Sequence, residues 1–561
     1  MITRREIESV QAGDLPGLLR ALTSIDVAQT GPMGSQASLF LRGADSRQTL
    51  VLVDGVPLVR ADFGTASWQY LPLDQIERIE IVRGNLSSLY GAQAIGGVVQ
   101  IVTRRAGAPQ ATLALGSHGT AQAAVAGGTT LGGSDTPTRV AASLSHRRTR
   151  GYSARDVAVD PGANPDRDAA RQDAGNLQLE QTWARGQRTQ LSYLQSRTRS
   201  DYDGFVPGLD DVLTTRVVAL GLNTMHALSN SVDLSAALGQ TRENFDDPTG
   251  FAAEGHNRVR QGTLQLQWRA EAAHEWQLGV EAKRERYGDT NTPDRERNTD
   301  SLRAGWIGRF GTASDNAAWQ LQANLRSDRS SDFGRATTGL LALAYTLQPG
   351  LKLSAQGSTG FSAPSFLDQL YANPATTLRP ERSRQAEVAL QWSAGATLAR
   401  MALFVQRQRD RISFDPVTFE TVNIARARNR GVELMVQAPV GPGTLGVEAT
   451  LQDPRDASTD QPLKRRARQS LALNYSATID AWSAAAYLRH SGKRLDVDPL
   501  SFGDAYNPAR TALDVALHRQ LDAQWRLSAK LDNVFGTRAS EVLGYTAAPR
   551  SLLVTLQGTL K

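Results

Sequence analysis

Oxygen-bearing side chains recur at alternate positions in one polar stretch of this sequence. Asn164, Asp166 and Asp168 stand two residues apart, and Tyr202 and Asp203 follow on the next expected hairpin. Calcium takes six to eight oxygen ligands, and alternate side chains of a loop can converge on one such cation. The pattern therefore indicates a calcium site, although most aspartate-rich loops are simply solvated. Two carboxylates nearby are looser additions to the ligand set: Asp156 and Asp211.

Motifs for nucleotide binding and for catalysis are not found in the sequence. Residues 91–97, GAQAIGG, lack the Lys-Ser/Thr ending and the following helix of a phosphate-binding loop. The seven histidines are scattered without metal-binding spacing, cysteine is absent, and no nucleophile elbow of a serine hydrolase occurs. The residues thus favour a protein that is not an enzyme.

Apolar and polar residues alternate over most of the chain from about residue 110 onward. In each alternating segment one face of a strand would be apolar, and the other would carry Gln, Arg and Glu. A dry core would not accept that polar face unpaired, whereas a water-filled or plugged lumen would. Tryptophan stands at segment ends, where an interfacial girdle would lie. Clear examples are residues 264–269, 276–283, 319–326 and 525–532.

The length fits a large barrel. Roughly 450 residues divided among 22 strands leave about 20 for each strand and its connection, which suits tilted strands of about 10 residues. A soluble array such as a propeller is the alternative, but no fixed repeat is present. No apolar run of about 18 residues occurs, so the sequence predicts no transmembrane helix.

The first 105 residues show a different pattern of expected helices, strands and turns. Residues 7–10 and 15–22 have helical spacing, with Asp14 as a plausible N-cap. Residues 50–58 read as a hairpin turning at Asp54-Gly55. Residues 76–103 read as strand, glycine-rich turn and strand. A small mixed α/β unit is expected.

These motifs, in their order and spacing, resemble TonB-dependent outer-membrane receptors. The resemblance rests on residues 41–43 (LRG), 50–58 and 76–103, and then on 360–364 (GFSAP), 378–381 (LRPE), 429–434 (NRGVEL) and 532–536 (DNVFG), with 544–545 and 549–550 near the end. It implies a 22-stranded antiparallel transmembrane β-barrel over 110–561, with residues 1–105 as a mixed α/β plug in its lumen. It also implies a nutrient importer of the bacterial outer membrane.

Within that family the plug text looks most like that of the cobalamin receptors. The likeness places Gln36, Ser38 and Asp45 on a first apical plug loop and Phe63-Gly64 on a second, where substrate would bind. It also implies that calcium orders the extracellular loops that carry the acidic positions above. The expected ligand is cobalamin or a related corrinoid.

Other readings stay open. A ferric-siderophore receptor is the alternative within transport, whereas a haem receptor would offer an axial histidine that residues 30–70 lack. A passive porin or adhesin would leave the plug unexplained, and barrels can also host catalysis. The net charge of +6 is spread along the chain, so we expect no nucleic-acid partner. The dense basic cluster at 464–468 is read as a solvated rim or lumen.

The ends of the sequence carry further expectations. No signal peptide precedes the plug text, and the short segment that family members offer to TonB would lie upstream of Met1, so we expect a truncated start. The chain ends in Leu560-Lys561 rather than in the aromatic residue usual for the family. Outer-membrane lipid and TonB are the expected partners of a monomer.

Overall fold

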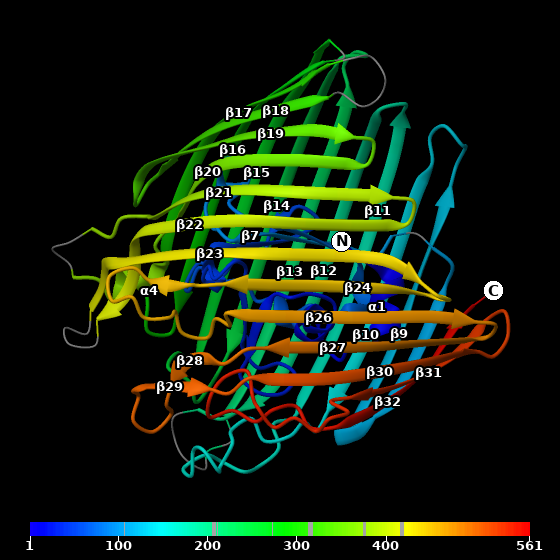
Figure 1. Cartoon of the computed structure of the whole chain (residues 1–561), viewed down its shortest axis with the longest axis vertical. Helices are drawn as coiled ribbons and strands as arrows, with labels where there is room; N and C mark the ends of the chain where they lie inside the picture. The colour runs from blue at the N-terminus through cyan, green and yellow to red at the C-terminus, as the bar shows by residue number, and fades with distance from the viewer. Residues whose placement is uncertain are drawn as a thin grey trace.

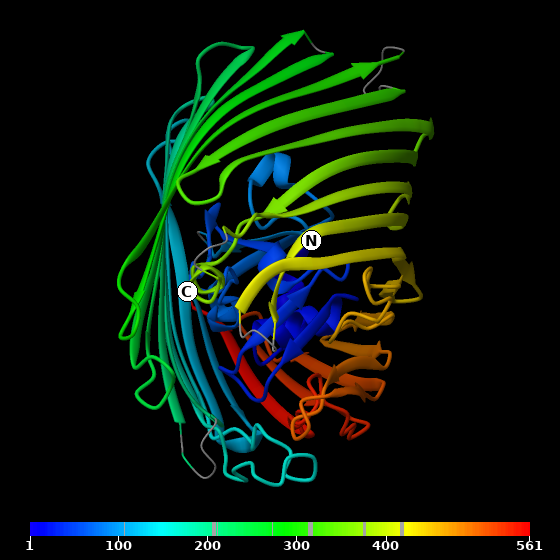
Figure 2. The ribbon, with the colours of Figure 1, turned by 90° about the vertical axis from the view of Figure 1, so that its left-hand side faces the viewer.

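A closed barrel of antiparallel strands surrounds an N-terminal unit in this computed structural model (Figures 1 and 2). The structure describes residues 1–105, 107–204, 209, 211–271, 273–311, 318–373, 377–415 and 420–560, and no side chain is described at 414, 415 or 424. Each barrel strand pairs with its neighbours in sequence, and β32 pairs with β8 to close the ring. The expected 22-stranded barrel is thereby confirmed.

The barrel strands are β8 (Gln110–Gly116), β9 (Thr120–Leu131), β10 (Thr138–Thr149), β11 (Ala170–Ala184), β12 (Gln187–Tyr202), β13 (Asp211–Ala227), β14 (Val232–Asp246), β15 (Glu254–Glu271), β16 (His274–Asp289), β17 (Arg295–Phe310), β18 (Trp319–Ser330), β19 (Gly334–Gln348), β20 (Leu351–Ser362), β21 (Glu381–Ala394), β22 (Thr397–Asp415), β23 (Glu420–Val440), β24 (Gly443–Gln452), β26 (Gln469–Ile479), β27 (Trp482–Ser491), β30 (Arg510–Gln520), β31 (Trp525–Asp532) and β32 (Ser551–Thr559). Short elements decorate the connections: η4 (Ser117–Gly119), α4 (Phe366–Leu370), β25 (Arg455–Asp456), β28 (Arg494–Val497) and β29 (Asp504–Asn507).

The N-terminal unit is the mixed α/β plug that the sequence predicts. Its sheet runs β1 (Ile2–Thr3), β6 (Ile76–Arg83), β7 (Gly97–Thr103), β4 (Thr49–Val53) and β5 (Val56–Pro57), with β4 and β7 parallel. The remaining elements are α1 (Arg4–Val10), α2 (Leu15–Leu22), β2 (Asp26–Gln29), β3 (Ala37–Phe40), η1 (Ser46–Gln48), η2 (Trp68–Tyr70), η3 (Leu73–Gln75) and α3 (Ser87–Tyr90). Asp14 caps α2 by accepting the Gly17 amide at 2.8 Å, as its position suggested.

The outer face of the barrel is apolar between two polar ends. On β16, Trp276, Leu278 and Val280 are exposed, whereas Glu285 on the opposite, lumenal face is buried. Every tryptophan except Trp68 lies near the end of the barrel where connections are short, as in the two-residue turn at 185–186. Long connections such as 150–169 and 533–550 lie at the other end. None of the described helices is long and apolar enough to cross a membrane.

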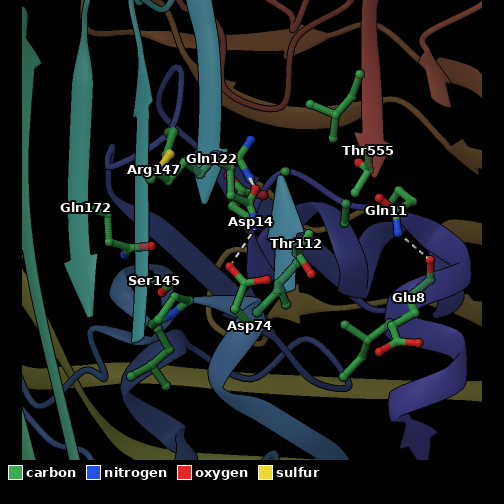
Figure 3. Close-up of a pocket in the computed structure, with 18 of the residues that line it drawn as sticks. Glu8, Gln11, Asp14, Asp74, Thr112, Gln122, Ser145, Arg147, Gln172 and Thr555 are labelled. Carbon is green, nitrogen blue, oxygen red and sulfur yellow. Dashed lines mark hydrogen bonds between the residues drawn. The ribbon is translucent and has the colours of Figure 1, made fainter. Parts of the chain in front are cut away.

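Polar contacts form one part of the boundary between plug and barrel wall. Figure 3 shows one part of it, where Gln122 of β9 donates to Asp74 of the plug at 2.8 Å beside a cavity of about 60 Å³. Elsewhere the approach is close, because a Cβ at Gly239 would lie 2.8 Å from the Val56 side chain. An apolar cluster also crosses the boundary, since the plug core packs against Leu194, Val217 and Tyr487 of the barrel wall.

Candidate functional site

The long-loop end of the barrel gathers three carboxylates from two loops. Asp166, Asp168 and Asp203 each offer an oxygen, and these oxygens all lie within 4.8 Å of one another. Asp166 and Asp168 belong to the connection between β10 and β11, and Asp203 follows β12 directly. The alternate spacing in the first loop and the hairpin pairing of β11 with β12 together bring them into one place.

Backbone amides hold two of these carboxylates in position. Asp168 accepts the Ala154 amide at 2.6 Å, and Asp203 accepts the Arg155 amide at 3.2 Å. Both bonds fold the start of the 150–169 loop back over the acidic group. Each carboxylate therefore keeps further oxygen lone pairs that can face a common point.

Two of the three carboxylates, Asp168 and Asp203, have raised pKa values. Burial, followed by the charges of Asp203 and Asp166, raises the pKa of Asp168 to about 7, against the opposing effect of the Ala154 amide. Burial and the neighbouring Asp166 charge also raise the pKa of Asp203. A divalent ion would reverse both effects, because an opposite charge favours the carboxylate form.

The other predicted metal ligands lie around this group. Asp211 is buried and accepts the Gly204 amide at 2.8 Å through Oδ2, while its buried Oδ1 has no hydrogen-bond donor among the described residues. Tyr202 donates to Asp247 at 2.8 Å. Asp156 instead caps its own turn by accepting the Ala158 amide at 3.0 Å.

Asn164 is tied to the same loop, since its carbonyl oxygen accepts the Ser153 hydroxyl at 3.2 Å. Asp247 was not foreseen from the sequence, although the Asp-Asp pair at 246–247 was a visible signal. Burial raises the pKa of Asp247 as well. The donor set is thus all oxygen, mostly anionic and partly unsatisfied, which fits a hard cation such as calcium.

The predicted plug residues also lie toward the long-loop end. Gln36 is exposed, and Ser38 lies in β3. The first plug loop sits against the barrel, because a Cβ at Gly34 would lie 2.6 Å from the Ser200 side chain. Phe63 is 51% exposed and stacks under the Arg60 guanidinium at 5.0 Å.

Asp45 is occupied by the barrel. Its carboxylate forms short ion pairs with Arg411 and Arg466, and Arg466 also lies 4.1 Å over the Phe40 ring. Burial alone would raise the pKa of Asp45, but Arg466 and Arg411 hold it well below its usual range. Gly64 approaches the same place, since its Cβ position is 3.6 Å from the Arg47 side chain. Arg466 belongs to the basic cluster at 464–468, so part of that cluster points into the lumen and contacts the plug.

Comparison with known proteins assigns the class. Residues 116–534 match the family described as "TonB dependent receptor-like, beta-barrel", and residues 1–98 match the "TonB-dependent Receptor Plug Domain". The chain belongs to the TonB-dependent receptor family. It is therefore a receptor of the bacterial outer membrane and not an enzyme, and its long loops are extracellular.

Individual relatives are named for different ligands. The vitamin B12 transporter BtuB of Vibrio cholerae is 28% identical, over 99% of this chain and 91% of its own length. The siderophore receptor PirA from Acinetobacter baumannii superposes with a TM-score of 0.82 at 15% identity, covering 100% and 98% of the two chains. A mutant of the ferric enterobactin receptor PfeA from Pseudomonas aeruginosa gives 0.81 at 17%, with the same coverage. The structural likenesses establish the fold alone.

Proposed function

We propose that this receptor imports cobalamin or a related corrinoid, and that calcium orders its extracellular loops for ligand binding. The observation that carries the proposal is the convergence of Asp166, Asp168 and Asp203, together with the 28% identity to a vitamin B12 transporter across nearly the whole chain. Neither observation alone specifies a corrinoid. Together they favour a corrinoid held under loops that a cation keeps in place.

The cation would act on the loops rather than on the ligand. Residues 150–169 and the segment after β12 would remain apart while their carboxylates repel, and a bound divalent ion would join them. Ordered loops lose less conformational entropy when ligand binds, which raises affinity. Calcium would be held by Asp166, Asp168 and Asp203. Asn164 lies in the loop of the first two, and Tyr202 and Asp211 lie at the adjoining ends of β12 and β13.

The ligand would rest on the extracellular surface of the plug. Amide, hydroxyl and aromatic contacts to the ligand would come from Gln36, Ser38 and Phe63. Gly64, which has no side chain, would let the ligand approach the second plug loop closely. Asp45 would act by holding the plug to Arg466 rather than by touching ligand. Release into the periplasm would follow when TonB remodels the plug.

A ferric-siderophore receptor is the second candidate, favoured by the Arg60 guanidinium that lies over the exposed Phe63 ring. A passive porin or adhesin is disfavoured because the N-terminal plug lies inside the barrel (Figure 2). Equilibrium binding of cyanocobalamin and of ferric catecholate siderophores to the purified receptor separates the candidates. Corrinoid binding alone supports the proposal, and siderophore binding alone overturns it.

A further inference from the structure

Arginines face each other in rows on the outer wall of the barrel. Arg258 on β15 stands directly opposite Arg242 on β14 and Arg286 on β16. Two further rows of the same kind cross other groups of three neighbouring strands near the extracellular end. They are Arg148, Arg171 and Arg199 on β10–β12, and Arg384, Arg407 and Arg428 on β21–β23.

These rows lie on the lipid-facing side. Along β16 the outward positions read Arg286, Arg284, Ala282, Val280, Leu278 and Trp276 from the extracellular end. Ten residues at about 3.3 Å each, tilted by about 40°, span about 25 Å of membrane, which is the height of a barrel's apolar band. With Trp276 at the periplasmic boundary, Arg286 therefore lies at the headgroup level of the outer leaflet.

Within the described part of the chain, most of these arginines form no ion pair with a carboxylate. Like charges directly opposite on neighbouring strands destabilise a sheet. Among the described residues, one arginine in each row pairs with a carboxylate: Arg286 with Asp294, Arg171 with Asp173, and Arg428 with Asp460. Arg242 reaches only the neutral Asn244 amide at 3.0 Å, and the buried Nε of Arg258 has no acceptor in the described part of the chain.

A groove accompanies the rows on this wall. It encloses about 1080 Å³ between the extracellular ends of β12–β16, and Arg197, Arg216 and Arg242 line it with His256 and Asp294. Arg197 and Arg216 are themselves directly opposed across β12 and β13. The groove is thus a concave surface at the membrane boundary, where these three arginines lie beside four carboxylates, Asp246, Glu254, Asp289 and Asp294.

We propose that the arginine rows bind the phosphate groups of an anionic glycolipid in the outer leaflet. Guanidinium forks match phosphate geometry with two parallel hydrogen bonds. Phosphates at headgroup level would neutralise arginines that otherwise repel one another, and the groove would admit the sugar that carries them. The tryptophans of the barrel strands lie toward the periplasmic end, so the barrel presents a different chemistry to each leaflet.

Lipid A, a bisphosphorylated glycolipid, is the probe. Purified full-length receptor in neutral detergent is titrated with lipid A and with its dephosphorylated form, and bound lipid is counted by native mass spectrometry. The variant Arg171→Gln/Arg258→Gln/Arg407→Gln removes the centre of every row. The control Arg139→Gln/Arg269→Gln/Arg309→Gln removes the same charge at the periplasmic end.

We expect the row variant to bind lipid A at least about tenfold more weakly than wild type and the control variant to match wild type. Wild type should prefer lipid A over the dephosphorylated form by a similar factor. Equal lipid A binding by the row variant and wild type would overturn the proposal. Equal binding of lipid A and its dephosphorylated form by wild type would also overturn the proposal. This comparison tests the proposal even if the row variant fails to fold.

Discussion

The guanidinium of Arg42, in the plug, lies 2.6 Å from the carboxylate of Glu433, in barrel strand β23. Arg42 binds Glu387 of β21 at the same distance, and Arg83 reaches Glu433 at 3.5 Å. Arg42 and both its carboxylate partners are buried. This network joins the plug to the wall at a point where water cannot replace a lost partner.

Replacing Arg42 with Met should loosen the plug. Two buried carboxylates would each lose one of their arginine partners, while Arg400 still pairs with Glu387 and Arg83 with Glu433. The cost should therefore lie below the roughly 3–5 kcal/mol of a buried pair that is broken outright. Hydrogen exchange of the β6 and β7 amides should accelerate accordingly. The control is Arg78→Met, whose partly exposed pair with Glu80 is worth about 0–1 kcal/mol. Equal exchange in both variants would contradict a structural role for Arg42.

Calcium affinity should rise with pH. The pKa of Asp168 is raised to about 7 in the folded protein, above the unfolded value of about 3.9. The protonated carboxyl therefore stabilises the cation-free fold below about pH 4, and this contribution is lost as pH rises through about 7. Calcium needs the carboxylate, so its affinity should fall about tenfold per pH unit below 7.

Calorimetry between pH 5.5 and 8 measures this dependence. The Asp168→Asn variant should bind calcium more weakly and with a much flatter pH profile. If wild type and variant share one profile, Asp168 is not a ligand.

Glu541→Gln should free the last extracellular loop from the plug. Glu541 lies in the 533–550 connection and binds Arg20 of α2 and Arg510 of β30, each at 2.7 Å. Burial would raise its pKa, but Arg20 and Arg510 lower it to about 2. The pairing therefore stabilises the fold above about pH 4 and is lost only as pH falls through about 2.

The same substitution at pH 7 should speed hydrogen exchange in α2. The control is Glu296→Gln, which breaks the exposed pair with Arg284 and should leave α2 unchanged. Unchanged exchange in Glu541→Gln would show that this loop does not brace the plug.

Much of the architecture could be predicted because short-range sequence patterns determine it. Alternation revealed the barrel strands, and the cap at Asp14 and the turn at Asp54-Gly55 marked plug elements. The acidic site was predictable in part, since Asp166 and Asp168 share a loop and Asp203 shares a hairpin. Asp247 could not be assigned, because its approach to Tyr202 depends on how separate loops pack.

The partners of Asp45 illustrate the same limit. Arg411 and Arg466 are more than 360 positions away in sequence and meet Asp45 only because the plug sits inside the closed barrel. Nothing in the spacing of the basic cluster at 464–468 distinguishes Arg466, which enters the lumen, from the more exposed Arg468. Such contacts follow from closure of the ring rather than from any local signal.

The most direct test of corrinoid binding under calcium-ordered loops is the affinity of the purified receptor for cyanocobalamin, measured in calcium and in EDTA. We predict at least about tenfold weaker binding in EDTA, because the loops then lose entropy when ligand binds. The variant Asp166→Asn/Asp168→Asn should keep the barrel folded and bind equally in both conditions. Equal wild-type affinity in calcium and EDTA would contradict the calcium site, and no cyanocobalamin binding in either would contradict the corrinoid assignment itself.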